Sequence, residues 1–206
     1  MNVSISIPNS LTALRIILTP VFVMLLFADS PFLKQLSLLV YVLAALTDWY
    51  DGWVARRYGY DSRWGKFLDP LADKILAAAA LFSFAALKLA DAWMVWIIVT
   101  RDFLITGLRS YAELSDRPIV TSKTAQAKTF GEFVVIYYAL ILYVANFNPL
   151  IRANYGDVID TLMHHDILFG MLLVVTLSTI GTGIMYLIDN RKLVIELYER
   201  ISGKPR

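Results

Sequence analysis

The chain contains no cysteine, so disulfides, zinc–thiolate sites and thiol nucleophiles are all excluded. Charged residues are also scarce, at 17% of the 206 residues, and they gather in short segments of the chain. A water-soluble fold of this length needs a more polar surface. The formal net charge of +2 is too small to indicate a nucleic-acid partner, and we expect none.

Apolar residues dominate instead. They make up 58% of the chain, against roughly 45–50% in soluble domains, and the mean hydropathy is +0.59. A helix needs about 20 mostly apolar residues to cross a bilayer. Six stretches approach this length: 11–28, 32–46, 67–87, 92–114, 130–145 and 167–188. Because a backbone in lipid must satisfy its own hydrogen bonds, we predict an all-α integral membrane protein with six transmembrane helices, forming one domain over residues 1–206.

The first of these stretches is predicted to be a retained span. It is long, no basic segment precedes it, and no small-residue cleavage site closes it, which argues against a signal peptide. Residues 1–8 alternate apolar and polar side chains. We expect them to form an N-terminal segment on the membrane surface.

Basic residues are distributed unevenly between the two sides that these spans define. An even number of spans puts both termini on one side, and the side richer in Lys and Arg faces the cytoplasm. Thirteen lie on the side of the termini: Arg56, Arg57, Arg63, Lys66, Arg109, Arg117, Lys123, Lys128, Arg191, Lys192, Arg200, Lys204 and Arg206. Three lie opposite: Lys34, Lys88 and Arg152. We therefore expect an inner (cytoplasmic) membrane protein with cytoplasmic termini and an outward loop at 146–166.

Acidic residues concentrate between two apolar stretches, in DWYDGWVARRYGYDSRWGKFLDPLAD at residues 48–73. At 100° per residue on a helix, Asp48 and Asp51 share one face, and on the next helix Asp69 and Asp73 share another. Small residues and one guanidinium lie on these faces: Gly52, Ala55, Arg56, Gly65, Ala72 and Ala80. Because the two helices are consecutive and antiparallel, we expect the four carboxylates to converge at their cytoplasmic ends.

Four converging carboxylates repel one another unless cations lie between them. A site made only of carboxylate oxygens suits hard ions such as Mg²⁺ or Mn²⁺, and two such ions can promote in-line displacement at phosphorus. The small residues leave room for a ligand, and Arg56 suits a diphosphate. The segment therefore predicts two divalent cations that bind a phosphorylated, lipid-linked substrate at the membrane surface.

The spacing of this segment resembles the signature of the CDP-alcohol phosphotransferase family. Asp48-x-x-Asp51-Gly52-x-x-Ala55-Arg56, then eight residues, then Gly65-x-x-x-Asp69-x-x-x-Asp73 is similar to it at every defined position. The resemblance implies that Asp48, Asp51 and Asp69 bind metal and that Asp73 is both a metal ligand and the catalytic base. It also implies a set of contacts to the CDP-linked lipid: Thr12, Gly52, Arg56 and Ser62.

Further segments resemble the bacterial branch of this family that uses glycerol 3-phosphate: IPNSLTALR near the N-terminus, TRDFLITGLRSYAE and AKT. The resemblance implies that a hydroxyl of glycerol 3-phosphate attacks the phosphorus of CDP-diacylglycerol, so that CMP leaves and phosphatidylglycerophosphate forms. It also implies a homodimer, whereas the distribution of basic residues is what predicts an active site facing the cytoplasm. Because glycerol 3-phosphate carries a phosphate dianion, cationic side chains should surround it.

Three basic residues near cytoplasmic helix ends are predicted to bind the acceptor phosphate: Arg109, Lys128 and Arg191. The alternative is that these residues only set the topology. Glu132 lies four residues after Lys128 and is expected to pair with it, and Asp102 is expected to have a structural role. His164 and His165 are expected to be solvated in the outward loop.

Two other functions remain open at this stage. The acceptor alcohol could be inositol phosphate, serine or phosphatidylglycerol, which would change the basic residues outside the motif and leave the aspartates in place. A divalent-metal transporter is the alternative of a different class, since intramembrane carboxylates mark ion paths. However, transporters place their ligands near the bilayer midplane, whereas these aspartates cluster at one end of the spans.

Overall fold

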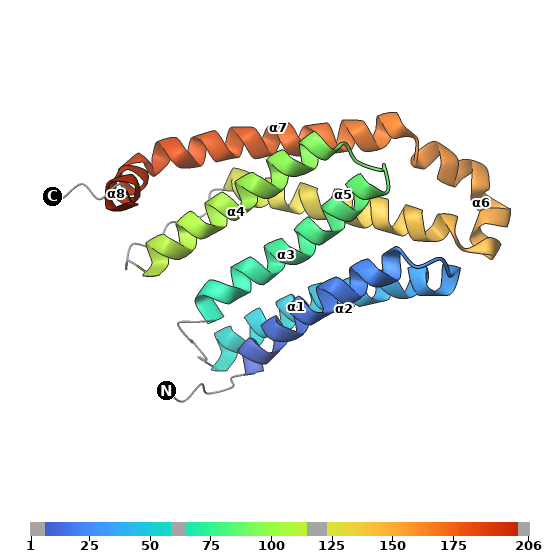
Figure 1. Cartoon of the computed structure of the whole chain (residues 1–206), viewed down its shortest axis with the longest axis horizontal. Coiled ribbons are helices and arrows are strands. Elements are labelled where there is room, and N and C mark those ends of the chain that lie inside the picture. Colours follow the sequence, from blue (N-terminus) through green and yellow to red (C-terminus); the bar gives the residue numbers. More distant parts are fainter. Residues whose placement is uncertain (1–6, 59–64, 115–122, 202–206) are drawn as a thin grey trace.

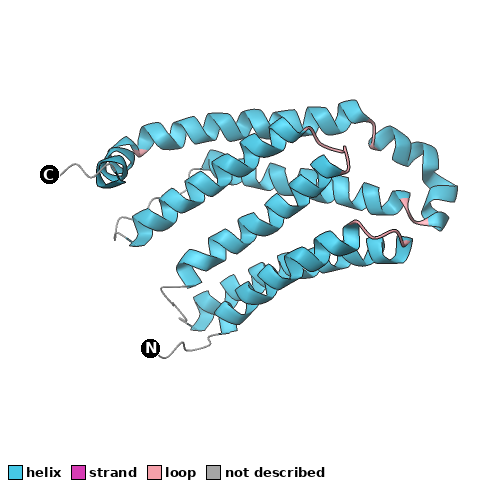
Figure 2. Cartoon of the chain, in the orientation of Figure 1, coloured by secondary structure: helices cyan, strands magenta, loops and turns pink. Residues whose placement is uncertain are grey.

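A computed structural model describes residues 7–58, 65–114 and 123–201, with the exception of the side chains of 7–10, 48–49, 51–58, 65–69, 114, 192 and 198–201. Throughout these residues the regular structure is α-helical (Figure 2). The helices are α1 (Ile7–Leu26), α2 (Pro31–Tyr58), α3 (Gly65–Ala86), α4 (Ala92–Leu114), α5 (Lys123–Asn146), α6 (Pro149–Leu162), α7 (His165–Asp189) and α8 (Arg191–Ile201). The all-α prediction is confirmed for the part described, and the expected N-terminal surface segment lies mostly outside it.

Six helices coincide with the six predicted apolar stretches. α4 has the bounds predicted for it, and α2 continues past its apolar part into the aspartate segment, as expected. α5 begins at Lys123 rather than at residue 130. Its first turns contain Lys, Gln and Ala, which are good helix formers but too polar to count toward an apolar stretch.

Two helices, α6 and α8, were not expected. The predicted outward loop contains α6, which Asn148 caps by accepting hydrogen bonds from the amides of Leu150 and Ile151 at 3.0 and 3.2 Å. Pro149 occupies the first turn of α6, where its missing N–H is not needed by the helix. Arg152 donates to Asp160 further along α6, and this hydrogen bond lowers the pKa of Asp160 below its usual value.

The helices run back and forth between two ends of an elongated bundle (Figure 1). α1 begins and α8 ends at the same end of the bundle, whereas the turns after α1 and α3 and the helix α6 lie at the other end (Figure 1). α1 packs on α2 and α3, α4 packs between α3 and α7, and α5 packs on α7. The N-terminal half of α3, the C-terminal half of α4 and the first turns of α5 therefore share one end.

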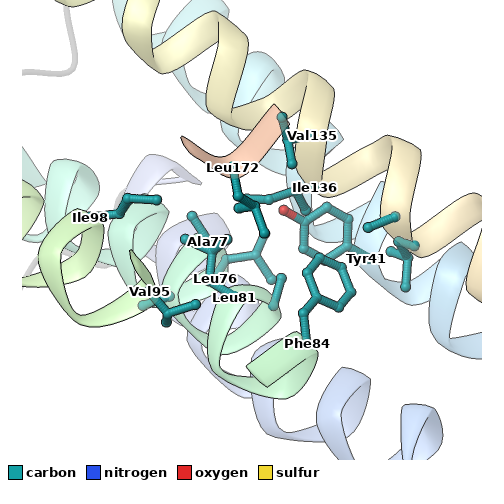
Figure 3. Packing of buried hydrophobic residues seen from close by; sticks show 14 of the residues in the cluster. Tyr41, Leu76, Ala77, Leu81, Phe84, Val95, Ile98, Val135, Ile136 and Leu172 are labelled. Atoms are coloured by element: carbon teal, nitrogen blue, oxygen red, sulfur yellow. The ribbon is translucent and has the colours of Figure 1, made fainter. Parts of the chain in front are cut away.

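Buried apolar side chains from six helices, α1 to α5 and α7, form the core, part of which is drawn in Figure 3. They include Tyr41, Leu76, Leu81, Phe84, Val95, Ile98, Ile136 and Leu172. α3 runs through the middle of this cluster, and its alanines Ala72, Ala77 and Ala80 are almost fully buried. Such small side chains let neighbouring helices approach closely. This close packing fixes the rotation of α3, and with it the direction of the polar residues on its N-terminal half.

The surface is strongly apolar for a protein of this size. α5 and α7 are long and apolar enough to cross a bilayer, and shorter apolar segments occupy Leu11–Leu26 and Pro31–Thr47. Many large apolar side chains are exposed along these helices, for example Ile17, Met24, Phe32, Phe130, Val174 and Leu177. α3 and α4 are continuous helices, but charged residues divide their apolar runs. Contact with lipid would account for the exposed apolar surface, while six spans stay a prediction.

Candidate active site

The four signature aspartates lie on the two helices for which they were predicted. The backbones of Asp48 and Asp51 belong to α2, and those of Asp69 and Asp73 belong to α3. Only the side chain of Asp73 is described. The predicted contacts of Asp48, Asp51 and Asp69, and of Gly52, Arg56 and Ser62, lie outside the described residues or side chains. Within the described part, no three metal-binding side chains come together, so the predicted metal site stays a prediction.

Asp73 is held by an arginine that the motif does not contain. Arg15 lies on α1 with no exposed surface, and its Nη1 donates to Asp73 Oδ1 at 2.5 Å. Its Nε donates to the backbone oxygen of Ala44 on α2 at 3.3 Å. One guanidinium therefore joins α1, α2 and α3, and it leaves the Asp73 carboxylate about one-third exposed (34%).

The sequence carried a signal for Arg15 that motif spacing does not capture. A charge within an apolar span is costly unless it has a partner, and Arg15 is the one basic residue of the first apolar stretch. Thr12 lies one turn earlier on α1 and is buried beside it. The predicted contact of Thr12 with the CDP-linked lipid stays a prediction.

A cavity of about 410 Å³ opens beside Asp73, and we call it the Asp73 cavity. Its lining combines Asp73 and Lys74 from α3 with Arg109 from α4. The other lining residues are Pro70, Thr106, Ser110, Glu113 and Thr129. The structure thus brings the predicted base and one predicted acceptor-phosphate residue to the same cavity.

A second cavity of about 370 Å³, the Tyr186 cavity, adjoins the first. The two share Lys74, Thr106, Arg109 and Thr129. The Tyr186 cavity is further lined by Arg101, Asp102, Ile105, Ala125, Gln126 and Tyr186. Cations and hydroxyl groups therefore continue from the neighbourhood of Asp73 across α4 to the end of α7.

A buried network of charges lies behind these cavities. Asp102 accepts hydrogen bonds from Lys74 and Lys128, both at 2.6 Å, and from Arg101 at 3.1 Å. Lys128 also donates to Glu132 at 2.7 Å, so the predicted pair is confirmed. The Lys128 side chain has no exposed surface and contacts two carboxylates, and its predicted contact with the acceptor phosphate stays a prediction. Asp102 joins α3, α4 and α5, as its expected structural role requires.

Among the described residues, two buried polar atoms on side chains that line the Tyr186 cavity have no hydrogen-bond partner. They are Arg101 Nε and Tyr186 Oη. Leaving such a group unsatisfied costs about 1–3 kcal/mol. The guanidinium of Arg101 is held at its other end, where Nη2 donates to Thr182 Oγ1 at 2.9 Å.

The remaining predicted residues lie apart from the two cavities. Arg191 is exposed at the start of α8 and is not among the lining residues of either cavity. Its predicted role in acceptor binding is untested by these contacts. His164 and His165 are exposed, as expected, and the side chain of His164 caps the start of α7.

Comparison with known proteins places these features in a family. The family model described as CDP-alcohol phosphatidyltransferase matches residues 5–173, which include Arg15, Asp73 and Arg109.

Three relatives carry the name CDP-diacylglycerol–glycerol-3-phosphate 3-phosphatidyltransferase. The protein of Bacillus subtilis (strain 168) is 33% identical over 150 residues, covering 67% of this chain and 77% of its own. The protein of Rickettsia bellii (strain RML369-C) is 35% identical over 130 residues, covering 63% and 72%. The protein of Salmonella paratyphi A (strain ATCC 9150 / SARB42) is 35% identical over 141 residues, covering 66% and 76%. The chain described here belongs to the CDP-alcohol phosphatidyltransferase family.

Proposed function

We propose that this protein transfers a phosphatidyl group from CDP-diacylglycerol to glycerol 3-phosphate. One observation carries the proposal: Asp73, the predicted base, shares a cavity with Arg109, a cation suited to the acceptor phosphate. Both lie in the part of the chain that the family model matches, and the names of the relatives give this donor and acceptor.

The chain's own residues position the acceptor in this mechanism. Arg15 holds the Asp73 carboxylate in place, and Arg109 binds the phosphate of glycerol 3-phosphate. Asp73 removes the proton of the acceptor hydroxyl as its oxygen forms a bond to the phosphorus attached to diacylglycerol. The bond between that phosphorus and CMP breaks, and CMP leaves with the electron pair. The products are phosphatidylglycerophosphate and CMP.

The signature residues fit divalent metal by their type and spacing. Asp48 and Asp51 lie three residues apart on α2, and Asp69 and Asp73 lie four apart on α3, so each pair occupies one face of its helix. Their donors are all carboxylate oxygens, which suit Mg²⁺ or Mn²⁺. We propose that these four aspartates hold two such ions. When bound, the ions would neutralise charge on the phosphate oxygens.

We further propose that the six predicted spans cross the inner membrane with both termini in the cytoplasm. The shared end of α1 and α8 in the bundle supports this topology (Figure 1), as do the apolar surfaces of α5 and α7. In this orientation both cavities open near the cytoplasmic ends of the helices. Glycerol 3-phosphate, which is water-soluble, would reach them from the cytoplasm. The homodimer implied by the family resemblance stays a prediction.

CMP release by the purified full-length protein tests the proposal. The protein is assayed in detergent with CDP-diacylglycerol and Mg²⁺, and glycerol 3-phosphate, inositol phosphate, serine and phosphatidylglycerol are offered separately. We expect release with glycerol 3-phosphate alone. EDTA should stop the release, and added Mg²⁺ or Mn²⁺ should restore it, because carboxylate-bound ions exchange with a chelator.

Each result has a definite meaning. Release with a different alcohol would refute the acceptor and keep the family chemistry. Full activity in EDTA would refute the proposed metal site. Folded protein that releases no CMP with any acceptor would refute phosphatidyl transfer itself.

A further inference from the structure

Lys74 is the residue that joins the Asp73 cavity to the Tyr186 cavity. It follows Asp73 on α3 and lines both cavities. Its Nζ donates to Asp102 Oδ2 at 2.6 Å, and its side chain keeps 19% of its surface exposed. A lysine ammonium carries three N–H donors, and the bond to Asp102 uses one of them. The remaining donors are therefore available to a ligand in the cavities.

The charges around Lys74 leave a positive surplus. Among the described residues, three cations, Lys74, Arg101 and Lys128, pair with two buried carboxylates, Asp102 and Glu132, and Arg109 lines both cavities with Lys74. Asp73 is paired with Arg15, and Arg109 and Glu113 are both exposed, so water screens their charges more than those of the buried groups. The net positive charge of this cluster suits a phosphate monoester dianion.

We propose that Lys74 is a binding residue for the acceptor phosphate and that Asp102 is the positioning residue that holds it. This proposal rests on the proposed function. With the phosphate between Lys74 and Arg109, the side chains of Arg101 and Tyr186 lie on the wall of the adjoining cavity. The hydroxyl end of the acceptor then points to Asp73, because Asp73 lines only the first cavity.

The buried network explains how Lys74 is kept in this place. Asp102 reaches it from α4, while Lys128 from α5 binds the other oxygen of the same carboxylate. Glu132 in turn holds Lys128. Lys128 thus acts through Asp102. This indirect role is compatible with its complete burial, because it needs no direct contact with the substrate.

The test compares two acceptors that differ only in the phosphate. Full-length variants are assayed with CDP-diacylglycerol and Mg²⁺, using either glycerol 3-phosphate or glycerol. We expect Lys74→Met to lower kcat/KM for glycerol 3-phosphate by about 10–100-fold, the value of a charge-assisted hydrogen bond. This loss should come mainly through KM. Any transfer to glycerol and the KM for CDP-diacylglycerol should change little, and Lys74→Arg should restore most of the loss.

Lys88→Met is the matched control, because Lys88 is exposed and lies beyond the opposite end of α3. It should leave the kinetics of both acceptors unchanged. Asp102→Asn should raise the KM for glycerol 3-phosphate by a smaller factor. In the KM for glycerol 3-phosphate, the double variant Lys74→Met/Asp102→Asn should lose less than the product of the two single losses, because Asp102 acts on the phosphate through Lys74. Loss of its bonds to Arg101 and Lys128 should appear as lower stability in both variants that carry Asp102→Asn.

The outcomes separate this inference from the proposed function. If the wild-type protein uses glycerol 3-phosphate and Lys74→Met keeps its KM, the Lys74 site is refuted while the function stands. If Lys74→Met impairs glycerol and glycerol 3-phosphate equally, its role is structural and the inference is again refuted. Multiplying losses in the double variant would refute the positioning role of Asp102. A wild-type protein that is inactive with every acceptor would refute the proposed function.

Discussion

At the scale of single residues, the pairing of Arg15 with Asp73 decides how the predicted base is presented. The guanidinium is fully buried and contacts both Asp73 and the carbonyl of Ala44. Arg15 therefore has two roles, because it fixes the position of the Asp73 carboxylate and it links α1, α2 and α3. These two roles can be separated by substituting each partner of the pair.

Asp73→Asn should abolish turnover, because an amide cannot accept the hydroxyl proton, while the amide oxygen still accepts from Arg15 and keeps the protein folded. Arg15→Met should reduce both turnover and stability, the latter by about 2 kcal/mol for a broken buried contact. CMP release and thermal unfolding in detergent measure the two effects. Activity above a few per cent in Asp73→Asn would exclude Asp73 as the base.

The motif spacing identified Asp73 but not its partner. A signature reports residues that are close in the sequence, whereas Arg15 and Asp73 are 58 residues apart and meet only when α1 packs on α3. The same holds for Lys74 and Asp102, which are 28 residues apart. By contrast, Lys128 and Glu132 are one helical turn apart, and their pairing follows from helix geometry alone.

At the scale of helices, the contact between α4 and α7 sets the position of Arg101. Gly183 on α7 is buried against this side chain, and a Cβ there would lie 3.2 Å from Arg101 Cγ. Thr182, the residue before Gly183, accepts from Arg101 Nη2. The absence of a side chain at Gly183 thus allows α7 to hold Arg101 at the wall of the Tyr186 cavity.

Two glycine substitutions on α7 test this contact. Gly181→Ala meets nothing within 4 Å and should stabilise the protein by about 0.5–1 kcal/mol through helix propensity. Gly183→Ala gains the same propensity but displaces Arg101, and we expect a net loss of about 1 kcal/mol together with a several-fold higher KM for glycerol 3-phosphate. Thermal unfolding gives the stability of the two variants, and acceptor kinetics give their KM for glycerol 3-phosphate. Equal stabilisation by both substitutions would contradict the described contact.

Helix positions were predictable where long apolar runs marked them, as in α1, α4 and α7. α6 was missed because polar residues interrupt its apolar ones and leave no long apolar run, although Asn148 and Pro149 mark its start. α8 was missed because it is short and amphipathic. The length of an apolar run identifies helices that can cross a bilayer, and it does not identify shorter or more polar helices.

At the scale of the whole molecule, the predicted topology separates α6 from the first turn of α5. The 24 residues of α5 span about 36 Å at 1.5 Å per residue, which exceeds the hydrocarbon core of about 30 Å. Asp157 on α6 and Lys123 at the start of α5 are both exposed. The proposed orientation puts Asp157 outside the cell membrane and Lys123 in the cytoplasm.

The absence of cysteine makes this topology easy to measure. A thiol reagent that does not cross membranes should label Asp157→Cys in intact spheroplasts, and it should label Lys123→Cys only after permeabilisation. The unmodified chain is the control, because it has no thiol to react. Labelling of both positions from the same side would refute the six-span arrangement.

The contact between Arg15 and Asp73 also has a consequence for how the protein is made. A ribosome adds about 5–20 residues per second, so the 58 residues between the two take roughly 3–12 s to synthesise. In the proposed topology, α1 carries during that interval an arginine without its carboxylate partner, which is unfavourable in lipid. We therefore expect stable insertion of α1 to follow the synthesis of α3, so that the order of synthesis becomes part of how the candidate site is assembled.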